Sequence, residues 1–213
     1  QYLVGKCPWR DFELTVGPGV LIPRQETELL IDFAIEIVDP LFKGRWADLG
    51  TGSGAIAVAL SKTFPCAEGH AVDFSKEALA IAKKNMTKLS PRSNVIFHLG
   101  DWWKPLKPFW GTLGLVIANP PYIPLSVLSL LEPCIKEHEP KLALSGGSDG
   151  LQALKEIISG SMNGICSGGS LILEHHHDQS EKVLQLIIDS GFKDVTFKTD
   201  LNGIRRFAMG IRP

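Results

Sequence analysis

Short apolar runs bounded by turn residues alternate along this chain with segments of helical character. The runs predict strands at 45–49, 69–73, 94–99, 113–118 and 169–174. The segments between them predict helices at 28–38, 54–64, 75–89, 150–158 and 179–190. Two last runs, 193–200 and 205–211, predict a β-hairpin around Asn202-Gly203. Residues 1–28, with turn signals at Gly17-Pro18-Gly19 and Pro23, predict a loop-rich start.

This alternation predicts an α/β fold. We expect a Rossmann-like, doubly wound sheet of seven mainly parallel strands that ends in an antiparallel hairpin. Helices should cover both faces of the sheet, and Ser75 is placed to cap the helix at 75–89. Open sheets of this kind bind ligands at the carboxyl ends of their strands, so the side chains that follow each strand are the first candidates for chemistry.

Composition narrows the class of protein. The 213 residues are 44% hydrophobic and 21% charged, with a formal net charge of −1. That balance offers no basic excess for sequence-independent binding of nucleic acid, and no apolar run reaches membrane-spanning length. We therefore expect one soluble globular domain that binds neither a membrane nor, directly, a nucleic acid.

The cysteines indicate a reducing compartment. Cys7, Cys66, Cys134 and Cys166 are scattered without a C-x-x-C pair, which fits neither a disulfide framework nor a zinc site. We expect the cytoplasm, or a mitochondrion or plastid in a eukaryote. The chain starts at Gln1 rather than Met, so we expect a piece of a longer protein.

The turn Asn119-Pro120-Pro121-Tyr122 directly follows the predicted strand 113–118 and should lie on the ligand edge. Two consecutive prolines remove two backbone donors and fix two φ angles, which makes the turn rigid. An amide and a phenol flank it. Such a turn suits gripping a planar group that carries an NH2.

A glycine loop, Asp48-Leu49-Gly50-Thr51-Gly52-Ser53-Gly54, follows the first predicted strand, and Asp73 ends the second. Glycines allow unusual φ angles and close approach of a ligand, and an acidic residue in the place of Asp73 binds ribose hydroxyls. The spacing differs from that of dinucleotide binders, and Asp48 would repel a pyrophosphate. S-adenosylmethionine fits these conditions, because it has a ribose, an adenine, a positive sulfonium and no phosphate; the competing interpretation is a structural tight turn.

Asp101-Trp102-Trp103 follows the third predicted strand. Asp101 can accept from an adenine amino group and Trp102 can pack on a nucleobase, unless both tryptophans serve local packing. Three adjacent histidines, 175–177, invite a metal site, but consecutive side chains point in different directions and no further ligand lies nearby at suitable spacing. We predict no metal.

Together these features resemble the class I S-adenosylmethionine-dependent methyltransferases, and more closely the catalytic domain of the HemK/PrmC family of release-factor glutamine methyltransferases. The resemblance covers nearly the whole chain. Its matching segments are Gln1-Tyr2-Leu3-Val4-Gly5, Gly19-Val20-Leu21-Ile22-Pro23-Arg24 with Thr27-Glu28, the glycine loop, Asn119-Pro120-Pro121-Tyr122-Ile123, and Glu139-Pro140-Lys141-Leu142-Ala143-Leu144 with Gly146-Gly147 and Asp149-Gly150-Leu151.

The resemblance implies the class I methyltransferase fold, with residues 1–40 packed as a segment and helix on a methyltransferase domain at 41–213. It implies S-adenosylmethionine as cofactor, leaving S-adenosylhomocysteine, and a monomer that methylates the glutamine amide in the Gly-Gly-Gln motif of class 1 peptide-chain release factors. Three departures stand out: the family's N-terminal substrate-binding helical domain is absent, Gln25-Glu26 replaces Pro-Asp or Pro-Glu, and 174–179 is rich in histidine.

Each candidate residue then takes a role. Asn119, Pro120 and Tyr122 are the catalytic candidates, and with Pro121 they bind the substrate amide. Arg24, Thr27 and Glu28 either order the N-terminal segment over the site or form an ion-paired helix start. The candidates for holding the cofactor are Gly50, Thr51, Gly52, Ser53, Gly54, Asp73, Asp101, Trp102 and Asn119.

Three other functions remain open. An N6-adenine DNA methyltransferase also presents a planar NH2 to such a turn, but it needs a flipped base and usually a basic recognition region. A glutamine methyltransferase acting on a ribosomal protein shares the turn, and only the segments 23–28 and 139–150 favour release factors. A catalytically silent binding partner would tend to lose the glycine loop or the Asn-Pro-Pro-Tyr turn, and both are intact.

Overall fold

A seven-stranded sheet forms the centre of the computed structural model, which describes residues 1–132 and 138–213. The strand order is β5-β4-β3-β6-β7-β9-β8, with β3 paired in parallel to both β4 and β6. β9 runs antiparallel to both of its neighbours, β7 and β8. The sheet strands are β3 (Arg45–Leu49), β4 (Glu68–Asp73), β5 (Val95–Leu99), β6 (Leu113–Ala118), β7 (Ile165–Glu174), β8 (Lys193–Thr199) and β9 (Arg205–Ile211). The predicted fold class is confirmed, as are the strands and the C-terminal hairpin.

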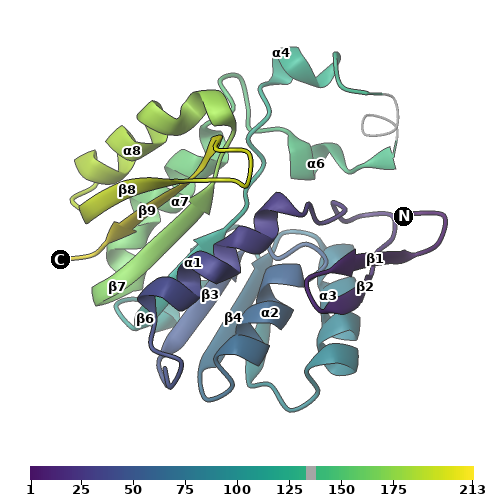
Figure 1. Ribbon diagram of the computed structural model, residues 1–213, viewed down its shortest axis with the longest axis horizontal. Helices are drawn as coiled ribbons and strands as arrows, with labels where there is room; N and C mark the ends of the chain where they lie inside the picture. The colour runs from purple at the N-terminus through teal and green to yellow at the C-terminus, as the bar shows by residue number, and fades with distance from the viewer. Residues whose placement is uncertain (133–137) are drawn as a thin grey trace.

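Helices cover both faces of this sheet, as Figure 1 shows. The helices at 28–38, 54–64, 75–89, 150–158 and 179–190 were all predicted, and α7 is longer than expected. The longer helices are α1 (Leu29–Ile37), α2 (Ala55–Thr63), α3 (Lys76–Leu89), α7 (Gln152–Gly164) and α8 (Ser180–Asp189). The short ones are α4 (Leu125–Leu128), α6 (Lys141–Leu144), and the 3-10 turns η1 (Glu26–Glu28), η2 (Lys104–Phe109) and η3 (His177–Gln179). Ser75 caps α3, because its hydroxyl accepts from the Ala78 N–H at 3.1 Å.

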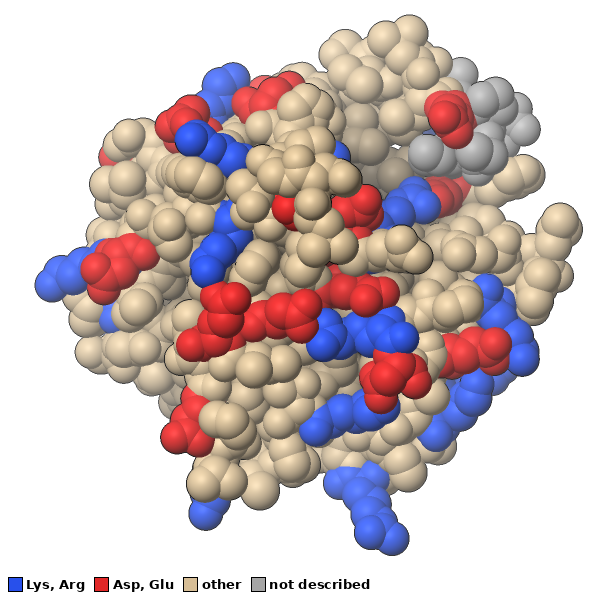
Figure 2. All heavy atoms as spheres, viewed as in Figure 1, with Lys and Arg blue, Asp and Glu red and all other residues tan. Residues whose placement is uncertain are grey.

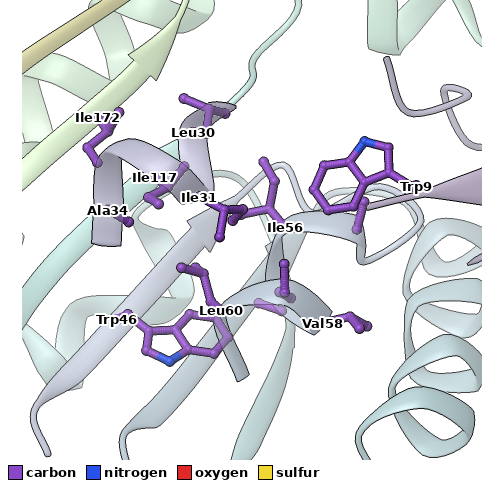
Figure 3. Close-up of a cluster of buried hydrophobic side chains, with 14 of the residues drawn as sticks. Trp9, Leu30, Ile31, Ala34, Trp46, Ile56, Val58, Leu60, Ile117 and Ile172 are labelled. Atoms are coloured by element: carbon purple, nitrogen blue, oxygen red, sulfur yellow. The ribbon is translucent and has the colours of Figure 1, made fainter. Parts of the chain in front are cut away.

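Side chains of the central strands alternate between two cores. Trp46 and Ile117 point into the core beneath α1 and α2, shown in Figure 3, whereas Ala47 and Val116 point into the core beneath α7 and α8. These strands are buried on both faces, which is why they read as continuous apolar runs in the sequence.

The N-terminal segment is more ordered than predicted. Strands β1 (Lys6–Trp9) and β2 (Phe12–Thr15) form an antiparallel hairpin where the sequence predicted loops. Each strand has four residues and β1 contains Pro8, so the period of two is too short to recognise. Its buried side chains, such as Trp9 and Leu14, join the core beneath α1 and α2.

Asn85 on α3 ties this hairpin to the sheet. Its side chain is fully buried, accepts from the Thr15 N–H at 2.8 Å, and donates to the carbonyls of Thr15 and Ser53, both at 2.8 Å. One side chain therefore holds β2 against the loop that follows β3.

Cys7, Cys66 and Cys166 carry free thiols, and Cys134 lies outside the described residues. Among the described helices, none has both the length and the apolarity that crossing a bilayer requires.

Candidate active site

A cavity of about 670 Å³ opens at the carboxyl edge of the sheet. The chain leaves β3 toward β4 on one side and returns to β6 on the other, so this edge is the switch point where such sheets bind ligands. Residues 19–21 and the α6 region complete its walls; α4 and α6 lie together at the top of Figure 1. Of the predicted site residues, those that line the cavity are Gly50, Gly52, Asp73, Asp101, Trp102, Asn119 and Pro121.

The glycine loop after β3 forms the floor of the cavity. Gly50 and Gly52 have φ angles of +80° and +55°, in the left-handed region that favours glycine. A Cβ on Gly50 would lie 3.1 Å from Cζ3 of Trp102, so the indole packs directly on the loop. The Gly52 N–H donates to Oδ2 of Asp73 at 2.8 Å, which ties the loop to the end of β4.

The other three cofactor candidates in the loop, Thr51, Ser53 and Gly54, do not line the cavity. Thr51 is buried and donates its hydroxyl to Oδ2 of Asp48 at 2.6 Å. Gly54, at φ +82°, packs so closely on α3 that a Cβ would lie 3.0 Å from Ala82. Ser53 is also buried. We infer that these residues shape the loop and leave contact with a ligand to Gly50 and Gly52.

Asp48, the first residue of the loop and still part of β3, carries a fully buried carboxyl. Burial, and after it the charge of Asp73, raises its pKa to about 7, although the hydroxyl of Thr51 favours the ionised form. Its Oδ1 has no hydrogen-bond partner within residues 1–132 and 138–213. A positively charged ligand at the loop would favour the carboxylate, whereas a pyrophosphate would oppose it. The loop therefore fits S-adenosylmethionine better than a dinucleotide.

The raised pKa of Asp48 predicts a stability effect that depends on pH. Its folded pKa of about 7 exceeds the ordinary 3.8, so the folded state binds the proton more tightly, and its contribution to stability is lost as pH rises from 3.8 to 7. Asp48→Asn cannot titrate. We expect its free energy of unfolding, relative to the parent protein, to rise by on the order of 3 kcal/mol between pH 4 and pH 7. Urea unfolding of the ligand-free proteins across this range measures the difference, and a constant difference would contradict the prediction.

Asn119, at the end of β6, is held by a buried chain of hydrogen bonds. Its Nδ2 donates to Oγ1 of Thr27 at 3.0 Å, and the Thr27 hydroxyl donates to Oε2 of Glu174 at 2.8 Å. The Tyr122 phenol donates to the other oxygen, Oε1, of Glu174 at 3.3 Å. The Asn-Pro-Pro-Tyr turn is thus divided: Asn119 and Pro121 line the cavity, whereas the Tyr122 hydroxyl turns to Glu174 and Pro120 is buried.

Two further contacts hold the walls of the site. Both oxygens of the buried Glu139 carboxylate accept from Nη2 of Arg24 at 2.8 Å, which joins the N-terminal segment to the region before α6. Gln179 donates from Nε2 to the carbonyls of Tyr122 at 3.0 Å and Gly150 at 3.2 Å. Arg24 and Thr27 therefore order the N-terminal segment over the site.

Glu28 faces away from the cavity, because its Oε1 accepts from the backbone N–H of Arg10 at 3.0 Å. Glu174 and Gln179 are site residues that the sequence did not predict. Glu174 is the last residue of β7 and of the predicted strand 169–174, and this place at the carboxyl end of a strand was the one signal available.

The two tryptophans have different places. Trp102, at φ +42°, lines the cavity, whereas Trp103 is buried and donates from Nε1 to the Ile157 carbonyl at 2.9 Å. Asp101 also lines the cavity and accepts from Nζ of Lys104 at 2.7 Å. One tryptophan and one carboxylate, adjacent in the sequence, thus line the cavity, and their contact with a nucleobase stays a prediction.

The histidine run has ordinary partners. Nδ1 of His175 lies 2.8 Å from the His176 carbonyl oxygen, and Nδ1 of His176 lies 2.7 Å from Oδ1 of Asp178. Over the described part of the chain, no cluster of three His, Cys, Asp or Glu side chains is arranged to hold a metal ion.

Comparison with known proteins gives consistent results. Residues 25–147 match the family described as the methyltransferase small domain. A release factor glutamine methyltransferase of Prochlorococcus marinus is 59% identical, over 100% of this chain and 73% of its own length. The crystal structure of a release factor-specific protein-(glutamine-N5) methyltransferase from Alicyclobacillus acidocaldarius has a TM-score of 0.55 at 27% identity, over 93% of this chain and 99% of its own. A methyltransferase from Pyrococcus furiosus shares the fold, with a TM-score of 0.66 at 15% identity over 93% and 88% of the two chains.

Proposed function

This chain belongs to the family of release factor glutamine methyltransferases, and we propose that it methylates the side-chain amide nitrogen of glutamine in the Gly-Gly-Gln motif of a class 1 release factor. The methyl donor is S-adenosylmethionine. The observation that carries the proposal is the orientation of Asn119. Its Nδ2 is engaged by Thr27, so its Oδ1 is left to accept from an NH2 group in the cavity.

We divide the residues that line the cavity into those that would bind the methyl donor, S-adenosylmethionine, and those on the acceptor side, which would bind the substrate amide. Gly50, Gly52 and Asp73 would hold the ribose and methionine parts of S-adenosylmethionine, with Trp102 and Asp101 beside the adenine. When bound, this cofactor supplies an electrophilic methyl group on a sulfonium. Asn119 and Pro121 line the same cavity, and we assign them to the side where an incoming amide would bind.

The chemical task of the acceptor side is to make a poor nucleophile react. An amide nitrogen shares its lone pair with the carbonyl, so it must be oriented before it can attack. Asn119 Oδ1 and the Pro120 carbonyl can accept from the two NH2 hydrogens, which turns the nitrogen lone pair toward the methyl group. The acceleration then comes from positioning and from polar groups that are already oriented. The proton can leave to water after transfer, so no strong general base is required.

The net charge of −1 and the face shown in Figure 2 favour a protein substrate over DNA. On the face shown in Figure 2, Lys and Arg are interspersed with Asp and Glu and form no continuous basic surface. A DNA methyltransferase needs such a surface to hold the phosphate backbone around a flipped base.

A comparison of three candidate substrates tests the proposed function. The protein is incubated with methyl-labelled S-adenosylmethionine and, separately, with a class 1 release factor, a ribosomal protein and unmethylated DNA. We expect label in the release factor alone, and none in a release factor whose motif glutamine is replaced by alanine. Label in the ribosomal protein or in DNA would assign the activity to that substrate, and no label in any of them would identify a silent binding partner.

A further inference from the structure

We propose that Thr27 and Glu174 form a hydrogen-bond relay that sets the orientation of the Asn119 amide, so that its oxygen and not its nitrogen faces the cavity. Thr27 and Glu174 are then positioning residues, because they act on the substrate through Asn119. The inference rests on the proposed function, since an oxygen is needed there only if the substrate presents an NH2. It assigns a role to the buried carboxyl of Glu174, which has none in the mechanism described above.

The relay joins three elements that are distant in sequence. Thr27 lies in η1, Asn119 follows β6, and Glu174 ends β7. Thr27 is 4% exposed and Glu174 is 2% exposed, so water does not compete for their hydrogen bonds. The two links, Asn119 Nδ2 to Thr27 Oγ1 at 3.0 Å and Thr27 Oγ1 to Glu174 Oε2 at 2.8 Å, both have ordinary lengths.

The direction of the relay follows from the donor and acceptor groups. An ionised carboxylate can only accept hydrogen bonds, so the Thr27 hydroxyl donates its one hydrogen to Glu174. The hydroxyl oxygen is then left as an acceptor, and of the two ends of the Asn119 amide only the NH2 can donate to it. The amide oxygen must therefore point the other way. Without the Thr27 hydroxyl, the two amide orientations would differ little in energy.

The surroundings of Glu174 bring the protonation of its carboxyl close to neutral pH. Burial raises the pKa of Glu174 to about 7, whereas the hydroxyls of Thr27 and Tyr122 and then the charge of Arg206 lower it, and the charge of Glu26 raises it. The adjacent His175 is also buried, and burial lowers its pKa, so it adds no fixed positive charge near neutral pH. The carboxyl thus titrates within the working range of an enzyme.

Protonation would reverse the relay. A protonated Glu174 can donate to Thr27, which frees the Thr27 hydrogen for Asn119 Oδ1 and turns the NH2 of Asn119 toward the cavity. Turnover should then fall as pH drops through about 7, the pKa of Glu174. In Glu174→Gln this group cannot titrate, so the acid limb of the kcat profile should be absent. An acid limb that persists unchanged in Glu174→Gln would overturn the pH dependence of the relay.

Thr27 variants test the relay directly. Thr27→Val keeps the shape and removes the hydroxyl, whereas Thr27→Ser keeps the hydroxyl. We expect Thr27→Val to lose about a hundredfold in kcat, with the KM for the release factor and the Kd for S-adenosylmethionine within about threefold, and Thr27→Ser to restore most of the loss. Ser161→Ala removes a buried hydroxyl on α7 that, within the described residues, bonds only to the Ile157 carbonyl, so it serves as the matched control and should leave kcat unchanged. Equal turnover in Thr27→Val and Thr27→Ser would overturn the proposal.

A spectroscopic readout keeps this test independent of the proposed function. In protein labelled with ¹⁵N-asparagine, the Asn119 side-chain NH2 signal is identified by its loss in Asn119→Ala. We expect one of its protons to exchange slowly with solvent in the parent protein and in Thr27→Ser, and quickly in Thr27→Val. Fast exchange in the parent protein would overturn the relay. Failure of the parent protein to label any release factor would instead overturn the proposed function, and the exchange result would still stand.

Discussion

Replacing Asn119 with alanine is expected to lower kcat for methyl transfer about a thousandfold, the scale seen when one oriented polar group is removed from an active site. The loss arises because the Oδ1 acceptor disappears and the substrate NH2 is no longer held with its lone pair toward the methyl group. Cofactor affinity should fall much less, by no more than about threefold, because the glycine loop and Asp73 are untouched. Calorimetric titration with S-adenosylmethionine and a radiolabelled transfer assay measure the two quantities separately.

A matched control for this variant removes an exposed amide elsewhere. Asn202→Ala lies in the turn between β8 and β9, where its side chain is exposed, and should change neither quantity. Unchanged turnover in Asn119→Ala would contradict the mechanism. A loss of cofactor binding as large as the loss of turnover would assign Asn119 to the cofactor instead.

Replacing Asp73 with alanine should have the opposite signature, a loss of cofactor affinity of about a hundredfold or more. Asp73 is expected to bind the ribose hydroxyls, and it also holds the loop. Its Oδ2 accepts from the Gly52 N–H at 2.8 Å and its Oδ1 from the Ser75 N–H at 2.9 Å. Removing it takes away a ligand contact and frees Gly52 from its position. Calorimetric titration with S-adenosylmethionine measures the change in affinity.

Asp39→Ala is the matched control for Asp73→Ala. Oδ1 of Asp39 accepts from the Leu41 N–H two residues on, as Asp73 does from Ser75, but Asp39 lies between α1 and β3 and does not line the cavity. We expect its cofactor affinity to equal that of the parent protein. If Asp73→Ala binds as tightly as Asp39→Ala, Asp73 does not hold the cofactor.

The sequence predicted most of the fold because the central strands carry a strong local signal. Arg45–Leu49 and Leu113–Ala118 have the bounds expected of them, since both are buried on two faces and end at turn residues. The β1–β2 hairpin was missed for the opposite reason. Its strands are short, and Asn85, the side chain that secures it, lies 70 residues further along.

The site was predicted only as far as single motifs extend. Asn119 and the glycine loop stand in recognisable turns after strands, so their places could be inferred. Glu174 could not be inferred as a partner of Thr27, because the two are 147 residues apart and are brought together by the packing of α1, which follows η1, against β7. Thr51, Ser53 and Gly54 were predicted to contact the cofactor but do not line the cavity. A motif does not reveal which of its residues face a ligand.

The buried Asn85 also sets an order of events during synthesis. Strand β2 leaves the ribosome some 70 residues before the side chain that accepts its backbone N–H. The hydrogen bonds from Asn85 to β2 and to Ser53 in the loop after β3 therefore cannot form until α3 has emerged and packed. Non-local contacts of this kind slow folding, because the intervening chain must be ordered before they can form. The loop that forms the floor of the cavity thus gains its contact with Asn85 only after the N-terminal hairpin has been synthesised.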